Sequence, residues 1–400
     1  MEDAAKIVDW LTDGTEDVVS RELLVQKIED SQKSGTPLTV KLGVDPTAPD
    51  IHLGHTVVME KLRQFQELGH RVVFLIGDMT GRIGDPTDRQ AARTALSSDA
   101  VAQFSRTYVE QAGKILDKDR LILRYNSEWL SGLSFDAVLE LLSKMTVARV
   151  LERDDFHQRF EQHVPIHLHE LVYPLMQGYD SVALKADVEL GGTDQRFNIM
   201  TARHIQEAFG QSPEVGMFLP ILEGTDGVRR MGKSLGNYIG VNEDPVDMYG
   251  KVMSIPDSII VRWSTLLLGR SGEALERRLE SGENPRNLKA ELAFGLVARF
   301  SGQDAAEHAQ NRFDSLFRDR EVPTDAPVLD WELPWRGSAL DLVARLPEMP
   351  SRAEAKRLLQ QGGISLNGAR LALGEDVEVQ PGNWIKVGKR RYFRFDGPQK

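Results

Sequence analysis

The fold of this chain is decided by the stretch LTVKLGVDPTAPDIHLGH, which runs from Leu38 to His55. Its first part, Leu38–Val44, has the length and the apolar, β-branched content of a strand. Turn residues follow at Asp45–Pro46, and helical patterning begins near His52. A strand that enters a helix through a short turn is the first half of a βαβ unit.

Similar strand-like runs alternate with longer helical patterns through the first half of the chain. They lie at Arg71–Ile76, Leu121–Arg124 and Ala186–Leu190. The alternation predicts an α/β fold with a Rossmann-like, doubly wound, mostly parallel sheet and helices on both faces. Because ligands bind such sheets beyond the carboxyl ends of the strands, we expect a site after Val44 and after Leu190.

The chain is long enough for several domains, since 400 residues exceed what one core usually supports. We predict a Rossmann-like catalytic domain over residues 1–223 and an all-α domain over 224–320. Residues 321–337 are rich in proline and poor in periodicity, which is typical of a linker. Residues 338–400 predict a small α+β unit, in which Asn367–Gly368 marks a hairpin turn.

Charge is distributed unevenly along the chain, whose formal net charge is −11. Residues 338–400 contain 11 basic and 7 acidic side chains, whereas the remainder contains 38 and 53. A basic tail on an acidic body predicts contact with RNA, and an ordinary solvated surface is the alternative.

Three features of the sequence bear on its location. Apolar runs such as Val72–Ile76 are too short to span a bilayer. The acidic N-terminus lacks the pattern of a signal peptide. The chain contains no cysteine, which removes disulfides and thiolate chemistry. Together they predict a cytoplasmic protein without a membrane partner.

The motif His52-Leu53-Gly54-His55 stands where the first helix begins. Backbone N–H groups at a helix start favour phosphate, and Gly54 lets a nucleotide approach the backbone closely. His52 and His55 are three residues apart and therefore share one face. Taken alone, the motif fits equally an ordinary helix start with satisfied histidines.

A second motif, Arg230-Met231-Gly232-Lys233-Ser234, lies in the glycine-rich segment Gly224–Asn237. A mobile loop with these cations could close over a pyrophosphate and neutralise the charge that develops there. A solvated basic loop is the alternative. Together, and in this order, the two motifs predict the halves of one ATP phosphate site and hence nucleotidyl transfer.

The two motifs resemble the HIGH and KMSKS signatures of the class I aminoacyl-tRNA synthetases. Further blocks are similar to the tyrosyl-tRNA synthetases, and they lie at Val44–Ala48, Gly81–Pro86, Tyr173–Asp180 and Gly191–Gln195. The C-terminal unit resembles the S4 RNA-binding domain of the bacterial members. The resemblance covers essentially the whole chain. Arg230 and Gly232 depart from the KMSKS pattern, where a lysine and a serine stand.

The resemblance implies two sets of residues around ATP. The catalytic set is Thr47, His52, His55, Arg230 and Lys233. The ATP-binding set is Asp45, Gly54, Asp194, Ser234, Arg89 and Arg93. A solvated helix face remains the alternative for Arg89 and Arg93.

For tyrosine, Tyr173, Gln177 and Asp180 stand at positions i, i+4 and i+7 and so share one face of a helix. The resemblance implies that Asp85, Tyr173 and Gln177 hold the α-ammonium and that Asp180 accepts from the phenol. By the same resemblance, Gln195 lies near the reacting carboxylate. Lys41 stands where many bacterial members have a tyrosine that bonds the phenol, and it could pair with Asp180 or point elsewhere.

The implied activity is that of a tyrosine–tRNA ligase, with ATP, L-tyrosine and tRNA(Tyr) as substrates. Mg²⁺ is expected to arrive with ATP, because no metal site built by the protein is evident. The resemblance also implies a homodimer, and RNA contacts by Arg352, Lys356 and Arg357. The alternatives are a tryptophanyl-tRNA synthetase, a small-acid ligase such as pantothenate synthetase, and a catalytically silent RNA-binding relative.

Overall fold

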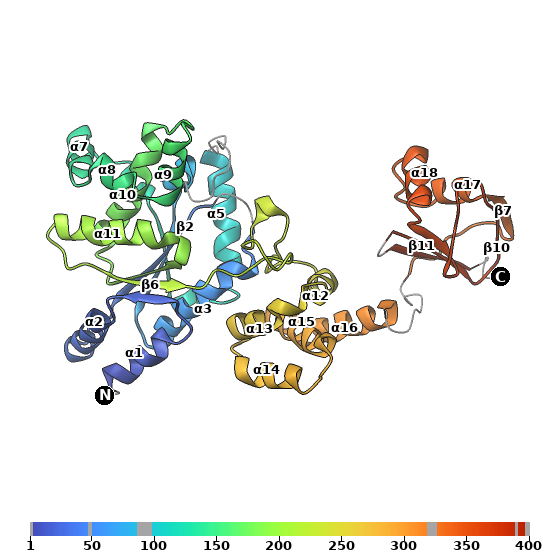
Figure 1. The fold of residues 1–400 in the computed structure, drawn as a ribbon, viewed down its shortest axis with the longest axis horizontal. Coiled ribbons are helices and arrows are strands. Elements are labelled where there is room, and N and C mark those ends of the chain that lie inside the picture. Colours follow the sequence, from blue (N-terminus) through green and yellow to red (C-terminus); the bar gives the residue numbers. More distant parts are fainter. Residues whose placement is uncertain (1–2, 47–49, 86–97, 318–325, 389–390, 397–400) are drawn as a thin grey trace. The chain divides into compact units, whose positions relative to one another are not determined.

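The structure is a computed structural model that describes residues 3–46, 50–85, 98–317, 326–388 and 391–396. It divides into two compact units, Met1–Ala306 and Glu307–Lys400, and each is considered by itself. Figure 1 shows the elements of both units. Of the helices within the described ranges, none has the length and apolar character needed to cross a membrane.

A six-stranded sheet forms the centre of the first unit. Its strands are β1 (Asp17–Val19), β2 (Thr39–Val44), β3 (Arg71–Ile76), β4 (Leu121–Tyr125), β5 (Val188–Gly192) and β6 (Val215–Leu219). Their order is β1-β6-β5-β2-β3-β4, and all neighbours are parallel except the edge strand β1. The α/β fold and its mostly parallel sheet are therefore as predicted.

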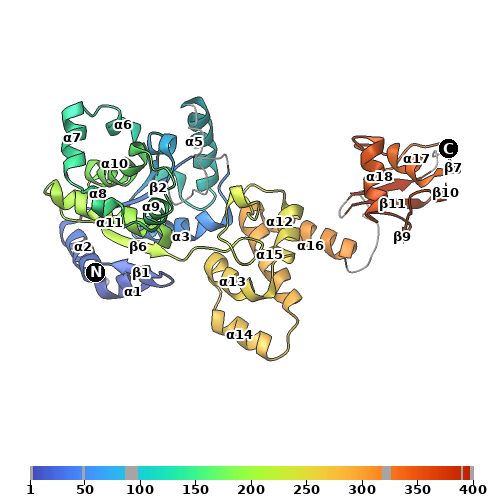
Figure 2. The same cartoon turned by 45° about the horizontal axis from the view of Figure 1, so that its top comes forward.

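The order of the strands reverses between β2 and β5. Helix α3 (Leu53–Glu67) follows β2 and α11 (Arg196–Ala208) follows β5. From β2 the chain continues to β3 on one side of this point, and from β5 it continues to β6 on the other side. Right-handed crossovers therefore place α3 and α11 on opposite faces of the sheet. Figures 1 and 2 show this arrangement. The carboxyl ends of β2 and β5 diverge here and leave a crevice for ligands.

Strands β2 and β5 are joined in a register that pairs Lys41 with Glu189. The central strands are otherwise rich in buried valine, leucine, isoleucine and phenylalanine, as in parallel sheets covered on both faces. Two polar side chains at the centre of such a sheet are exceptional, and they lie directly beneath the crevice.

The remaining helices of this part surround the sheet. They are α1 (Ala4–Thr12), α2 (Arg21–Ser34), α4 (Thr80–Ile83), α5 (Ser98–Ala112), α6 (Ser127–Leu130), α7 (Phe135–Ser143), α8 (Val147–Val150), α9 (Asp154–Glu161) and α10 (Leu168–Leu184). Helix α10 packs along α11 and carries Pro174 in its interior. The proline removes one backbone N–H donor, but the helix continues through it.

Between residues 244 and 317 the regular elements are helices, as the sequence predicts. They are α12 (Pro245–Met253), α13 (Ile260–Leu268), α14 (Gly272–Glu280), α15 (Pro285–Ser301) and α16 (Gln303–Phe317). Asp244 caps α12 and Pro245 opens it, a favourable start for a helix. Trp263 and the leucines of α15 are buried between these helices. The boundary between the two units falls within α16.

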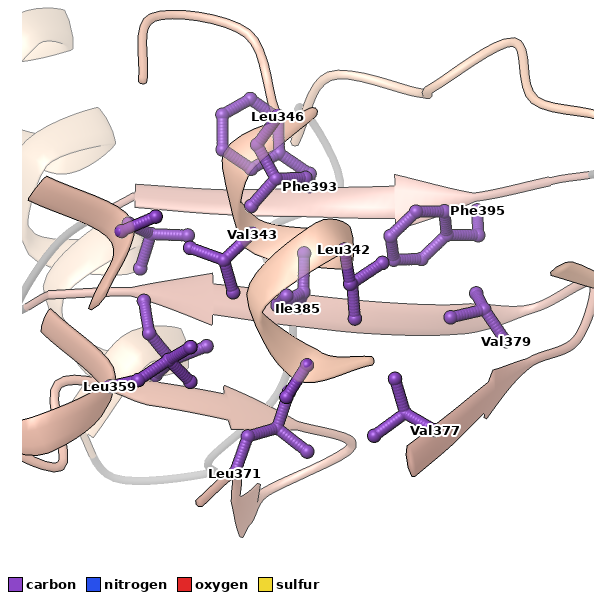
Figure 3. Packing of buried hydrophobic residues seen from close by; sticks show 14 of the residues in the cluster. Leu342, Val343, Leu346, Leu359, Leu371, Val377, Val379, Ile385, Phe393 and Phe395 are labelled. Carbon is purple, nitrogen blue, oxygen red and sulfur yellow. The ribbon is translucent and has the colours of Figure 1, made fainter. Parts of the chain in front are cut away.

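The C-terminal unit combines two small antiparallel sheets with two helices. Its elements are β7 (Trp335–Ser338), α17 (Ala339–Ala344), α18 (Arg352–Gln360), β8 (Ile364–Leu366), β9 (Ala369–Arg370), β10 (Asp376–Val379), β11 (Asn383–Val387) and β12 (Arg391–Phe395). Asn367 and Gly368 both have positive φ, as a tight hairpin turn between β8 and β9 requires. Figure 3 shows the separate apolar core, in which Leu342 and Ile385 pack together with Phe393 and Phe395.

Part of the predicted linker belongs to this unit. Leu329 is buried in its core, and the ring of Trp331 packs edge-on against Phe395 with centroids 5.3 Å apart. Trp335 begins strand β7. These apolar side chains, set between prolines, pack into the core of the C-terminal unit.

Candidate active site

A cavity of about 510 Å³ opens at the carboxyl ends of β2 and β5. The predicted residues that line it are Asp45, His52, Gly54, His55, Asp85, Tyr173, Gln177, Asp180, Asp194, Gln195, Arg230, Lys233 and Ser234. Thr47, Arg89 and Arg93 lie outside the described residues. The fold thus gathers both motifs and the polar face of α10 around one space.

The two histidines of the first motif lie against each other at the start of α3. The backbone N–H of His52 donates to Nδ1 of His55 at 3.2 Å, and the two rings are 3.9 Å apart. Burial, helped by the nearby Lys233, lowers the pKa of His55 to about 4, and burial likewise holds the pKa of His52 well below its usual range. Both rings are therefore neutral at pH 7, and His55 carries its proton on Nε2.

The second motif is held in shape by Asn237. Its Nδ2 donates to Asp226 Oδ2 at 2.9 Å and to the carbonyl of Arg230 at 3.0 Å, while its Oδ1 accepts from the N–H of Gly232. Gly232 itself has an extended backbone with φ of −161°. An added Cβ there would meet only Leu235, at 3.7 Å. Glycine is therefore not required at 232 by this conformation of the loop.

Two cations of the loop reach other groups of the cavity. Arg230 Nη1 lies 3.3 Å from Asp194 Oδ2, and the ammonium of Lys233 lies 3.2 Å from the hydroxyl of Tyr108. Burial lowers the pKa of Lys233 to about 8. Tyr108, on α5, was not among the predicted residues. A bound nucleotide would have to compete for both cations.

Tyr173 is tied to the residue that follows β2. Its hydroxyl donates to Asp45 Oδ2 at 3.0 Å, and Thr80 donates to Asp45 Oδ1 at 2.7 Å. Burial raises the pKa of Asp45 to about 7, and the nearby Asp85 adds to this effect. Asp45, assigned to ATP by resemblance, therefore also orients the Tyr173 hydroxyl.

Asp85 is surrounded by donors. Arg153 Nη2 pairs with its Oδ1 at 2.6 Å, and Gln195 and Asn198 donate to its Oδ2 at 2.8 and 3.2 Å. Arg153 could not be predicted from the sequence, because the residue stands in an irregular turn without a motif. Its burial and its position over the Phe156 ring identify it only in the structure.

Asp180 is a buried carboxylate that lines the cavity. Its Oδ1 accepts from Trp129 Nε1 at 2.7 Å, and its Oδ2 accepts from Asn126 Nδ2 at 3.3 Å. Burial raises the pKa of Asp180 to about 7, against the attraction of Lys41. Asn126 and Trp129 follow the carboxyl end of β4, and that position in a parallel sheet could have predicted them.

Lys41 is fully buried beneath the cavity. Its ammonium pairs with Glu189 Oε1 at 3.1 Å. Two alternatives were open for this side chain, pairing with Asp180 or pointing elsewhere, and the structure shows the second, with Glu189 as its partner. Glu189 itself lines the cavity.

The predicted RNA-binding residues are exposed on α18. Arg352 pairs with Asp341 at 2.7 Å and Arg357 pairs with Glu354 at 2.6 Å. Lys356 is exposed on the same helix. Such surface pairs are weak, so these cations remain able to turn toward a phosphate.

Comparison with known proteins agrees with this geometry. The family model for class I tRNA synthetases (W and Y) matches residues 33–318. The tyrosine–tRNA ligase of Carboxydothermus hydrogenoformans is 47% identical over 96% of this chain and 95% of its own length, and that of Haemophilus influenzae is 47% identical over 98% of each. The crystal structure of the Archaeoglobus fulgidus tyrosyl-tRNA synthetase with L-tyrosine aligns with a TM-score of 0.63 at 26% identity, over 77% of this chain and all of that one. The chain belongs to the class I tRNA synthetases for tryptophan and tyrosine, and within them to the bacterial tyrosine–tRNA ligases.

Proposed function

We propose that this chain activates L-tyrosine with ATP and transfers it to tRNA(Tyr). A carboxylate oxygen of tyrosine attacks the α-phosphorus, the bond to the β-phosphate breaks, and pyrophosphate leaves. A terminal ribose hydroxyl of the tRNA then attacks the carbonyl carbon of tyrosyl-adenylate, and AMP leaves. One observation carries the proposal: a single cavity holds both phosphate motifs and the carboxylate of Asp180.

At the nucleotide end, catalysis rests on positioning and charge, without a protein nucleophile. The neutral His52 and His55 donate hydrogen bonds to phosphate oxygens, while Arg230 and Lys233 neutralise the charge on the departing pyrophosphate. Asp194 accepts from the ribose once Arg230 turns to the phosphates. Mg²⁺ enters as part of the MgATP substrate; among the described residues no group of three or more His, Asp or Glu side chains could hold a metal ion.

At the amino-acid end, recognition rests on buried hydrogen bonds. Asp180 accepts from the phenol, which phenylalanine lacks, and a buried acceptor left unpaired disfavours that analogue. Asp85, Tyr173 and Gln177 surround the α-ammonium. Because Arg153 neutralises Asp85, much of the attraction for the ammonium comes from the oxygen atoms of the other two.

Contact with tRNA is assigned to the helical region and the C-terminal unit. Truncation after residue 325 removes both small sheets, α17 and α18 together with the apolar residues that pack against them, whereas a cut at 338 would leave Leu329 and Trp335 without their core. The truncated chain should form adenylate normally and charge tRNA poorly, and the difference from the full chain should shrink as salt is raised, because the unit's phosphate contacts are the ones that salt weakens. An equal loss of both activities would instead assign the unit to folding.

A homodimer is supported by exposed apolar side chains on the first unit. They gather on α7 to α9 and the start of α10, at Phe135, Leu139, Leu142, Val147, Phe160, Val164 and Leu168. Leu168 is 83% exposed, and so large an apolar surface favours association. The double substitution Phe135→Glu/Leu168→Glu should convert a dimer to a monomer in analytical ultracentrifugation.

We place the enzyme in the cytoplasm, because a chain without cysteine has no disulfide that would need an oxidising environment.

The decisive experiment is exchange of pyrophosphate into ATP with each of the twenty amino acids. We expect exchange with tyrosine alone. Exchange with tryptophan in its place would assign the chain to the other substrate of the family. Exchange with no amino acid would favour a catalytically silent RNA-binding relative.

A further inference from the structure

A buried charged cluster lies beneath the tyrosine pocket and contributes no atom to the reaction described above. Lys41 on β2 is fully buried, Glu189 on β5 is 1% exposed, and Glu214 before β6 is fully buried. Lys41 and Glu189 are register partners across neighbouring strands. Burying an ion pair is costly unless its remaining hydrogen-bonding atoms are satisfied, so such a cluster requires a physical reason.

Glu189 Oε1 accepts from two donors at once. The ammonium of Lys41 lies 3.1 Å from it, and Nε2 of Gln177 lies at the same distance. The ammonium also approaches the backbone carbonyl of Gln177, at 3.5 Å. Because an ionised carboxylate can only accept, Glu189 selects the NH₂ group of the Gln177 amide rather than its oxygen.

The other face of Glu189 meets Glu214. Oε2 of Glu189 and Oε2 of Glu214 are each buried without a hydrogen-bond partner among the described residues. Burial raises the pKa of Glu214 well above its usual range, and Glu189 adds to the effect. Burial alone would lower the pKa of Lys41, but the attraction of Glu189, Glu214 and Asp180 raises it. The raised pKa favours the neutral form of Glu214, and the ammonium of Lys41 pairs with Glu189.

We propose that Lys41 and Glu189 are positioning residues that orient the Gln177 amide, so that its carbonyl oxygen faces the α-ammonium of tyrosine. Gln177 lines the cavity, and with its NH₂ group held by Glu189, the oxygen is the part of the amide left to accept from a ligand. Lys41 thus acts on the α-ammonium of tyrosine through Glu189 and Gln177 and does not touch the substrate. This inference rests on the proposed function, because it takes Gln177 as part of the ammonium site.

The test compares three ligands that differ in the groups they offer. Tyrosine and tyramine both carry the ammonium, whereas 3-(4-hydroxyphenyl)propionate lacks it. In the variant Lys41→Met we expect the KM for tyrosine and the Ki for tyramine to rise about tenfold, as for loss of a hydrogen bond to a charged group. The Ki for 3-(4-hydroxyphenyl)propionate, measured by inhibition of pyrophosphate exchange, should stay within about twofold, and so should kcat.

Lys41→Met leaves an unpaired buried carboxylate and could fail to fold, so the double variant Lys41→Met/Glu189→Leu is measured beside it. This variant removes both charges yet still deprives Gln177 of its acceptor. Lys27→Met, which breaks the partly buried pair with Asp187 outside the cavity, is the matched control and should change none of the three constants.

An equal rise for all three ligands would overturn the proposal and assign the cluster to packing alone. A loss of discrimination between tyrosine and phenylalanine, with tyramine unaffected, would overturn it in favour of a role for Lys41 at the phenol. A wild-type chain without tyrosine-dependent exchange would overturn the proposed function itself, whatever the variants do.

Discussion

The two ends of the cavity are built in different ways. The amino-acid end consists of buried or half-buried side chains on β5, α10 and the segment after β4, and these side chains are hydrogen-bonded to partners within the protein. The nucleotide end consists of side chains on loops, where Arg230 is 37% exposed and Lys233 lies against Tyr108. Selectivity for the amino acid therefore depends on preorganised side chains, whereas the groups that stabilise the transition state must change partners during the reaction.

Breaking the rigid end should have the largest effect. In Asp180→Ala the phenol loses its acceptor, and Trp129 and Asn126 lose theirs. We expect the ratio of kcat/KM for tyrosine to that for phenylalanine to fall about a thousandfold, since a buried acceptor and its charge are both removed. Pyrophosphate exchange with the two amino acids measures it. Asp187→Ala, outside the cavity, is the control, and a ratio that survives in Asp180→Ala would exclude Asp180 as the hydroxyl acceptor.

A substitution at the nucleotide end should slow adenylate formation and leave the selectivity between amino acids unchanged. Lys233→Met removes a cation from the departing pyrophosphate, and we expect kcat for adenylate formation to fall about a hundredfold. The KM for tyrosine should change little. Single-turnover formation of adenylate is the measurement, with Lys289→Met on α15 as control. A large rise in the KM for tyrosine without a change in kcat would contradict the division between the two ends.

The two ends should also differ in how pH affects kcat/KM for the substrate that each of them binds. Asp180, whose pKa is about 7, accepts more strongly from the phenol when it is ionised, so kcat/KM for tyrosine should fall as pH drops through 7. Lys233, whose pKa is about 8, is charged only below that value, so kcat/KM for ATP should fall as pH rises through 8. Each limb should approach about tenfold per pH unit. The acid limb should vanish in Asp180→Asn and the alkaline limb in Lys233→Met; limbs that persist in these variants would assign them to other groups.

The smallest effect is expected at Gly232. Because its backbone is extended and a Cβ has room, Gly232→Ser should change the free energy of unfolding by less than about 0.5 kcal/mol. Adenylate formation should stay within about twofold of the wild type. Thermal unfolding and exchange kinetics check both. A large loss of activity with unchanged stability would show that the loop passes through a conformation that only glycine adopts.

Much of the fold was predictable because its periodicity is local. The parallel strands, the helices between them, the all-α region and the turn at Asn367–Gly368 all follow from spacing and turn chemistry. The C-terminal end of the predicted linker, 321–337, extends into the C-terminal unit. The prolines of this segment mask apolar residues such as Leu329, which pack against residues far along the chain. No local pattern reveals that packing.

Of the candidate site, the motif residues were predictable, whereas among their partners only Asn126 and Trp129 carry a signal, which is their position after the carboxyl end of β4. Thirteen of the assigned residues line one cavity, but Arg153, Trp129 and Tyr108 were missed. Each of these acts on a residue more than forty positions away, so only the tertiary fold brings them together. Lys41 was recognised as a departure from the family pattern, yet its partner Glu189 is 148 residues distant and could not be inferred from spacing.

The ion pair between Lys41 and Glu189 also has a consequence for how the chain folds. It joins β2 to β5, two strands that the chain forms far apart in sequence and must align without a connecting turn. A slip of one residue would turn each side chain to the opposite face of the sheet and leave a charge buried without its partner. The pair therefore penalises misaligned sheets more than hydrophobic residues could, and we expect apolar replacements at both positions to fold to a stable but less uniquely aligned sheet.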